Sequence, residues 1–126
     1  MKQIIKILLL GVFLYIGFTL QVTSAEAPTP PPLPPTTQEL ALKFSRQFGN
    51  DPKELLKVAK CESGLKQSAI NYNDGGKGKH SIGIMQFQVA TFDGWEKKLG
   101  EDLNIESEYD QLKLGSYMFS KGQQKQ

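Results

Sequence analysis

The sequence predicts a mainly helical α+β domain, with at most a small, irregular β-hairpin or sheet after the second of four helices. Two observations predict it. Apolar residues recur at helical spacing in four segments, each flanked by capping residues or glycine. A loop rich in Gly, Asn and Lys, residues 66–80, separates the second segment from the third. The folded part would span roughly 90 residues, enough for one modest core.

The N-terminal residues 1–25 have the pattern of a secretory signal. Lys2 and Lys6 precede the apolar run Ile7–Leu20, and small residues follow it at Thr23–Ala25. The alternative is an uncleaved membrane anchor, but a run of roughly 14 apolar residues is short against the ~20 that cross a bilayer. Either alternative places the rest of the chain outside the cytoplasm, whether secreted, periplasmic or at the cell surface.

Residues 26–37 form a proline-rich segment, and we assign the folded domain to residues 38–126. Successive prolines fix the backbone and remove amide donors, which predicts an extended, solvated spacer. It would either hold the domain away from a membrane or serve as a plain linker.

Composition excludes several function classes. The formal net charge is +2, and the basic residues are scattered rather than gathered with aromatics, so we expect no nucleic-acid partner. One cysteine, Cys61, and one histidine, His80, cannot build a zinc site, and we expect no metal or cofactor. We expect a monomer that touches a membrane only through an uncleaved N-terminal segment.

The first two helices have clear boundary signals. Thr36 and Glu39 form a capping box for the first helix, which ends at Gly49-Asn50. Asp51 caps the second helix and would pair with Glu54 in another capping box. Gly64 ends this second helix.

The apolar face of the second helix contains an acid. Leu55, Val58 and Ala59 share about a 100° arc of the helical wheel with Glu62. Partial burial and the negative end of the helix dipole would both favour a carboxyl that keeps its proton, as a general acid requires. The alternative is a solvated residue at the helix boundary.

The loop that follows predicts a turn or a short twisted hairpin, in which Ala69-Ile70 and Tyr72 pair weakly with Ile82 and Ile84. Asp74 is the only acid in the loop, and its Asn-Asp-Gly setting is typical of turn chemistry. His80 is expected to be exposed. The loop has no phosphate-binding spacing.

Two further helices complete the predicted fold. The third begins near Gln88 and runs to about Lys98, and its buried side consists of Val89, Phe92 and Trp95. Ser107 caps the fourth helix, whose apolar stripe consists of Tyr109, Leu112, Ser116 and Phe119.

Three short motifs resemble those of a known family. They are Glu62-Ser63-Gly64, Ala69-Ile70-Asn71 and Ser81-x-Gly83-x-Met85-Gln86. Together they resemble the soluble lytic transglycosylase (SLT) domain, which has the goose-type lysozyme fold. Cys61-Glu62-Ser63-Gly64 is also similar to the domain of resuscitation-promoting factors. The resemblance extends over roughly residues 55–122.

The resemblance implies cleavage of the β-1,4 bond between N-acetylmuramic acid and N-acetylglucosamine in peptidoglycan glycan strands. Glu62 would be the general acid and base, the substrate's acetamido group would stabilise the cation, and the product would be a 1,6-anhydromuramyl sugar. Ser81, Met85, Gln86 and Asn71 would bind substrate. Ordinary glycosidases use two carboxylates, so a single well-placed Glu fits this scheme.

Alternatives stay open at this point. A catalytic Asp74 would favour lysozyme-type hydrolysis with inversion through an activated water. A non-catalytic peptidoglycan-binding module would keep Glu62 only as a groove residue. A cysteine peptidase would use Cys61 and His80, but Cys61 lies near the C-terminus of its helix, where a thiolate is not favoured.

The sequence also departs from the family pattern. No Tyr-Asn-x-Gly segment follows Gly122, and neither a second cysteine nor a C-terminal tryptophan is present. We therefore expect a domain shortened at its C-terminal end. Tyr117 is a candidate to replace the tyrosine that relatives present to the substrate, but its position on the helix is ambiguous, and we do not assign it that role.

Overall fold

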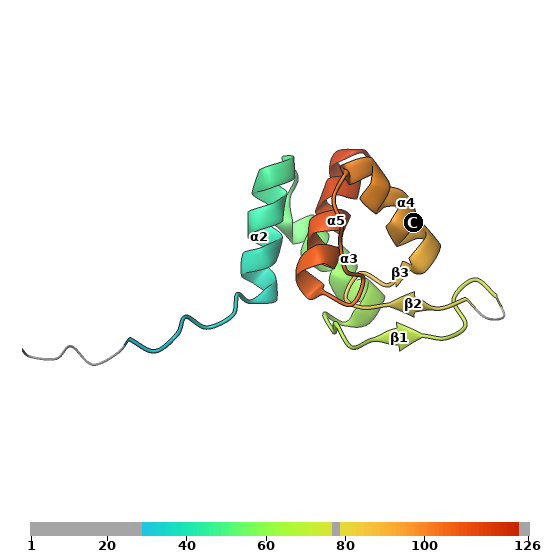
Figure 1. Cartoon of the computed structure of the whole chain (residues 1–126), viewed down its shortest axis with the longest axis horizontal. Coiled ribbons are helices and arrows are strands. Elements are labelled where there is room, and N and C mark those ends of the chain that lie inside the picture. Colours follow the sequence, from blue (N-terminus) through green and yellow to red (C-terminus); the bar gives the residue numbers. More distant parts are fainter. Residues whose placement is uncertain (1–28, 77–78, 124–126) are drawn as a thin grey trace, which may run out of the picture. The chain divides into compact units, whose positions relative to one another are not determined.

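The computed structural model describes residues 29–76 and 79–123, and its folded unit begins at Leu33. The elements in these residues are α2 (Thr37–Phe48), α3 (Pro52–Ser63), β1 (Ile70–Asn71), β2 (Ser81–Ile82), β3 (Phe87–Gln88), α4 (Val89–Leu99) and α5 (Glu108–Ser120). Helix α5 lies between α2 and α4, and the small sheet lies beyond the end of α3 (Figure 1). The predicted fold class, mainly helical with a small sheet, is confirmed.

The N-terminal signal or anchor that we predicted lies outside the described residues. Residues 29–36 have no helix or strand and are exposed. No helix among the described residues is long and apolar enough to span a bilayer.

The N-terminus of α2 is capped as predicted. The Thr36 hydroxyl accepts a hydrogen bond from the Glu39 amide, and the Thr36 amide donates to the Glu39 carboxylate at 2.7 Å. This backbone bond, and then a second from the Thr36 hydroxyl, lower the pKa of Glu39, because both bonds favour the ionised carboxylate. The helix ends at Gly49 in the left-handed conformation, as expected.

Helix α3 has the predicted bounds but only half of its predicted cap. The Asp51 carboxylate accepts from the Lys53 amide at 2.9 Å. The expected capping box with Glu54 is wrong, because the Glu54 side chain is directed to the rim of a cleft instead of back to the Asp51 amide. At the other end, the Gly64 amide donates to the carbonyls of Ala59 and Lys60, with φ at 65°.

The sheet is antiparallel in the order β1-β2-β3. Ile70 pairs with Ile82 as predicted, whereas Ile84 lies outside the sheet. The third strand was not predicted, and Gln88, expected in the third helix, belongs to it. Gln88 has an extended backbone and pairs with Ser81. It is also the N-cap residue of α4, which is why the helix begins one residue later.

The core collects the buried faces of all four helices and of the segment between β2 and β3. Its fully or nearly fully buried side chains are Leu40, Ala41, Phe44, Leu55, Ala59, Ile84, Met85, Phe87, Phe92, Leu112, Leu114, Met118 and Phe119. Burial of these apolar side chains is the main favourable term in folding.

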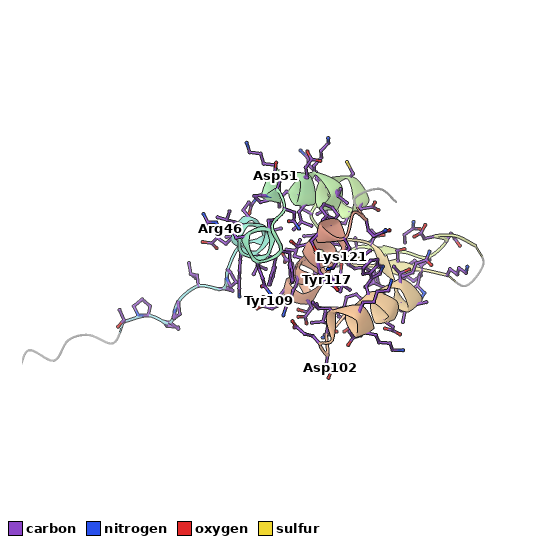
Figure 2. The ribbon with its side chains drawn as sticks, turned by 90° about the horizontal axis from the view of Figure 1, so that it is seen from above. Arg46, Asp51, Asp102, Tyr109, Tyr117 and Lys121 are labelled. Atoms are coloured by element: carbon purple, nitrogen blue, oxygen red, sulfur yellow. The ribbon has the colours of Figure 1, made fainter. Side chains whose placement is uncertain are left out.

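Two residues expected on buried helix faces are exposed. Val89, the first residue of α4, is 44% exposed. Tyr109 is 39% exposed, and its ring meets the edge of Phe44 with centroids 4.8 Å apart while its outer side faces solvent beside Lys43 (Figure 2).

One tight turn connects the sheet to the core. Gly83 has φ at +82°, and a Cβ atom there would lie 2.0 Å from the Gln111 Nε2 atom. Gln111 is completely buried, and its amide donates to the Ile82 and Ile105 carbonyls and accepts from the Met85 amide. The turn therefore requires glycine both for its conformation and for its contact.

Gly83→Ala should lower the free energy of unfolding by about 2 to 4 kcal/mol, because it combines left-handed backbone strain with overpacking against a fixed Gln111. Gly94→Ala is the matched control: Gly94 is helical with open space around its Cβ position, so alanine should raise stability by about 0.5 to 1 kcal/mol. Urea denaturation measures both. Equal midpoints for Gly83→Ala and the unmodified chain would contradict this account.

Candidate active site

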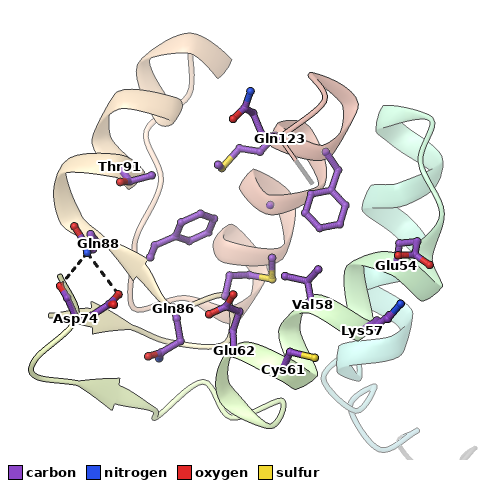
Figure 3. A pocket seen from close by; sticks show the side chains of 15 residues that line it. Glu54, Lys57, Val58, Cys61, Glu62, Asp74, Gln86, Gln88, Thr91 and Gln123 are labelled. Carbon is purple, nitrogen blue, oxygen red and sulfur yellow. Dashed lines mark hydrogen bonds between the residues drawn. The ribbon is translucent and has the colours of Figure 1, made fainter. Parts of the chain in front are cut away.

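A cleft of about 700 Å³ opens between α3, the β2–β3 turn and the two C-terminal helices (Figure 3). It has a polar side and an apolar side. The residues that line it are Glu54, Lys57, Val58, Cys61, Glu62, Asp74, Met85, Gln86, Phe87, Gln88, Thr91, Gly115, Met118, Phe119 and Gln123. A cleft of this size, with a few polar groups over an apolar floor, is typical of a small-ligand or oligosaccharide site.

Glu62 lies in the last turn of α3 and lines this cleft, with its carboxylate directed toward the sheet side (Figure 3). Its side chain is exposed, so the expected partial burial is wrong. Leu55 and Ala59, on the same face of α3, are buried in the core. In the last turn of the helix this face borders the open cleft, so no side chains cover it there. The helix thus presents the acid to whatever occupies the cleft.

The turn that faces Glu62 is held by polar side chains of α3 and of the loop after it. The Ser63 hydroxyl donates to the Ile84 carbonyl at 2.8 Å, with the Ala59 carbonyl at 3.1 Å as a second acceptor, and it accepts from the Lys66 amide at 3.1 Å. The Gln67 side chain accepts from the Ile84 amide at 3.1 Å. Both backbone groups of Ile84 are therefore bound to the same segment of the chain that carries Glu62.

Gln111 holds the next residue of the turn from α5, since its carbonyl accepts from the Met85 amide at 2.9 Å. Gly115, one turn further along α5, leaves room for the Met85 side chain, whose Cε atom lies 2.8 Å from a Cβ built at Gly115. Met85 is nearly buried and forms part of the cleft floor.

Gln86 has a left-handed backbone, with φ at 50°, which is uncommon for a residue other than glycine. Its side-chain amide donates to the Ala69 carbonyl at 3.1 Å and the Gly83 carbonyl at 2.9 Å. These two bonds compensate for the strain and use both amide hydrogens. The Gln86 carbonyl oxygen is then the part of the side chain available to accept a hydrogen bond in the cleft.

The structure brings together three of the predicted site residues, Glu62, Met85 and Gln86, in one cleft. Ser81 and Asn71 do not line it. Ser81 is completely buried in β2, and exposed Asn71 lies in β1, where its side chain accepts from the Asn73 amide at 3.3 Å.

Asp74 is half-buried and lines the cleft on the wall opposite Glu62 (Figure 3). The Ser81 hydroxyl donates to its carboxylate, and the Gln88 amide donates to its backbone carbonyl at 3.0 Å. Asp74 lies in the turn after β1, as its Asn-Asp-Gly setting predicts, and the Asn71 side chain adds a further bond at the start of this turn.

Cys61 and His80 do not meet. Cys61 is exposed and lines the cleft beside Glu62, whereas exposed His80 borders a separate small hollow with Gln88 and Val89. The geometry therefore offers no cysteine–histidine pair of the kind a peptidase uses.

Tyr117 does not reach the cleft. Its hydroxyl donates to the Lys98 carbonyl at 3.2 Å, and its ring packs against Phe48 and Trp95 on the far side of α5 (Figure 2). It does not substitute for a substrate-facing tyrosine.

Sequence reasoning missed several cleft residues. Phe119 was expected only in the core, although Gly115 and Phe119 lie at i and i+4 on one face of α5. The small residue at position 115 was the available signal. Thr91 and Gln123 carried no signal, because nothing in their local pattern distinguishes a cleft wall from solvent.

Among the described residues, no three His, Cys, Asp or Glu side chains come together as a metal site would require.

Residues 39–121 match the family described as Transglycosylase SLT domain, which is well over half of the chain. The chain belongs to this family. Comparisons with curated proteins and with solved structures gave no match. The match covers the sheet, three of the described helices and all but the first two residues of α2, and it includes every residue that lines the cleft except Gln123. Its membership indicates transglycosylase-type activity on peptidoglycan, a polymer outside the cytoplasm.

Ser63→Ala should lower the free energy of unfolding by about 1 to 3 kcal/mol, because the Ile84 carbonyl and the Lys66 amide lose a partner. It should also loosen the turn that faces Glu62. Ser68→Ala is the control, since Ser68 is exposed and should tolerate the change. Thermal unfolding followed by circular dichroism compares the two, and equal midpoints would show that Ser63 does not hold the turn.

Proposed function

We propose that this SLT domain is a peptidoglycan lytic transglycosylase that cleaves the β-1,4 bond between N-acetylmuramic acid and N-acetylglucosamine. Glu62 is its general acid and base. The observation that carries the proposal is the position of Glu62, a carboxylate at the end of α3 that projects into the cleft of a domain belonging to this family.

In the proposed reaction, Glu62 donates its proton to the glycosidic oxygen, and the bond to the muramyl C1 breaks. The acetamido group of the muramyl residue stabilises the developing positive charge. Glu62, now ionised, accepts the proton of the muramyl 6-hydroxyl as that oxygen attacks C1. The product is a 1,6-anhydromuramyl end, and no water is consumed.

The exposed position of Glu62 fits a cleft whose remaining wall is the substrate itself. A glycan strand that fills the cleft excludes water from around the carboxylate, and this exclusion strengthens its interactions with the sugar. The free Gln86 carbonyl oxygen is suited to accept from an acetamido N–H or a sugar hydroxyl. Met85 supplies apolar surface beneath the ring.

We also propose that residues 1–25 export the domain and that the proline-rich segment, residues 26–37, separates it from the membrane or from the exported N-terminus. The partner of the domain is then the glycan strand itself, and the domain works as a monomer without a cofactor.

Glu62→Gln should reduce the release of anhydromuropeptides from purified peptidoglycan by about 100-fold or more, because a glutamine can neither donate nor accept the reaction's proton. Glu106→Gln, the same change at an exposed residue outside the cleft, is the control and should stay active. Mass spectrometry of the soluble products measures both.

The same experiment separates the alternatives. Equal digestion by Glu62→Gln and the unmodified chain would remove Glu62 from the mechanism. Binding of peptidoglycan without any release would show a non-catalytic binding module.

Cys61→Ser should leave glycan cleavage unchanged, because Cys61 borders the cleft but has no histidine beside it and no proton to supply in this scheme. Cut peptides on intact glycan strands, lost in Cys61→Ser, would instead demonstrate a thiol peptidase. The assay separates glycan fragments from free stem peptides by liquid chromatography and mass spectrometry.

A further inference from the structure

The charged side chains that line the cleft are unevenly distributed. Glu54, Glu62 and Asp74 are acids. Lys57 is the only base among the lining residues that the structure describes. Asp74 lies at one end of the cleft, Lys57 lies at the other end, and Glu62 lies between them (Figure 3). The reaction proposed above gives Lys57 no role, although it is the one cation of the cleft lining that a bound strand would meet.

Lys57 and the catalytic acid belong to the same helix. Lys57 is exposed and precedes Glu62 by five residues, which is about 7.5 Å along the axis of α3 at 1.5 Å per residue. The next residue, Val58, is half-buried and also lines the cleft. This part of α3 therefore offers an ammonium group beside an apolar side chain, within about one sugar's length of the acid.

The proposed substrate carries its charge on every second sugar. N-acetylmuramic acid is an N-acetylglucosamine with a lactyl ether, a substituent that has one methyl group and one carboxyl group. This carboxyl group is either free and ionised or joined to a stem peptide, which has carboxylates of its own. Chitin has the same β-1,4-linked backbone without the lactyl group and is neutral. A cleft that distinguishes the two polymers must therefore recognise this substituent.

The charges of the cleft restrict where such a carboxylate can lie. Like charges repel at close range, and the repulsion increases where a ligand excludes water. A carboxylate is therefore disfavoured beside Asp74 and favoured beside Lys57, whereas a neutral sugar is affected by neither charge. Glu54 lies at the same end as Lys57 but three residues further from Glu62, so Lys57 is the charge nearer to the bond that is cleaved.

We propose that Lys57 is a specificity-determining residue, which binds the carboxylate of a muramyl substituent at its end of the cleft. Val58 contacts the methyl group of the lactyl ether. A strand shifted by one sugar would move its carboxylate away from Lys57, so the same contact favours the register that places a muramyl C1 at Glu62. The domain thereby selects muramyl glycan over a neutral glycan with the same backbone. This inference rests on the proposed function, because it names the part of the same substrate that the cleft recognises.

The experiment measures binding, so its result does not depend on turnover. The full chain with Glu62→Gln, in which cleavage is blocked, is titrated by NMR with three tetrasaccharides of the same backbone. They are chitotetraose, a GlcNAc-MurNAc repeat with free lactyl carboxylates, and the same repeat with stem peptides. A muramyl ligand should bind about 3- to 10-fold more tightly than chitotetraose, the gain expected from one ion pair that the ligand partly shields from water.

Lys57→Gln in the same background should remove this difference, and Lys57→Arg should retain most of it because arginine keeps the positive charge. Higher salt should also reduce the difference, since the contact is between charges at an open site. A loss for the ligand with free lactyl carboxylates assigns the contact to the lactyl group, and a loss confined to the ligand with stem peptides assigns it to the peptide. Either loss supports the inference.

Lys53→Gln is the matched control. Lys53 is an exposed residue of α3 outside the cleft, and its substitution removes the same charge without changing the three affinities. A loss as large as that in Lys57→Gln would assign the preference to net charge and would overturn the role of Lys57.

Two further results separate this inference from the proposed function. Equal affinities for muramyl and neutral ligands would overturn the inference, while release of anhydromuropeptides by the unmodified chain would leave the proposed function intact. No binding of any of the three ligands, together with no release of anhydromuropeptides, would overturn both.

Discussion

The structure depends on the hydrogen bonds that hold the turn between β2 and β3. Ser63 and Gln67 bind the carbonyl and the amide of Ile84, and Gln111 binds the Met85 amide from the opposite side. A tight turn leaves backbone groups without partners, and a buried, unpaired group costs about 1 to 3 kcal/mol. Three side chains from two distant segments satisfy these groups, so α3, the turn and α5 are joined by polar contacts.

This arrangement explains how an exposed acid can still be well placed. Glu62 precedes Ser63 directly, and Ser63 binds the turn that carries Gln86. The position of the carboxylate relative to the turn is therefore set by backbone and by a short side chain rather than by burial of Glu62 itself. A functional side chain in an open cleft has to be positioned by the residues around it. The hydrogen bonds of Ser63 to the turn do this for Glu62.

The sequence predicted features that depend on near neighbours. The capping box at Thr36, the stop at Gly64 and the cap at Ser107 were correct because each is decided within four residues. It could not predict the partial cap at Asp51 or the exposure of Glu62. Both depend on a cleft built by segments far apart in the chain, and a helical wheel cannot distinguish a face that lines a cleft from one that is covered.

The loop residues Asn71 and Asp74 illustrate the same limit, because Asn71 was expected at the site and does not line the cleft, whereas Asp74 does. Either residue type can form the turn, since both side chains accept hydrogen bonds from nearby amides. Which one turns inward is decided by β2, where the pairing of Asn71 with Ser81 places the buried Ser81 hydroxyl within reach of Asp74. A polar side chain that is fixed by a buried donor cannot relax into solvent. Asp74 is therefore held on the cleft wall, and the family motifs alone, which do not include this residue, give no indication of it.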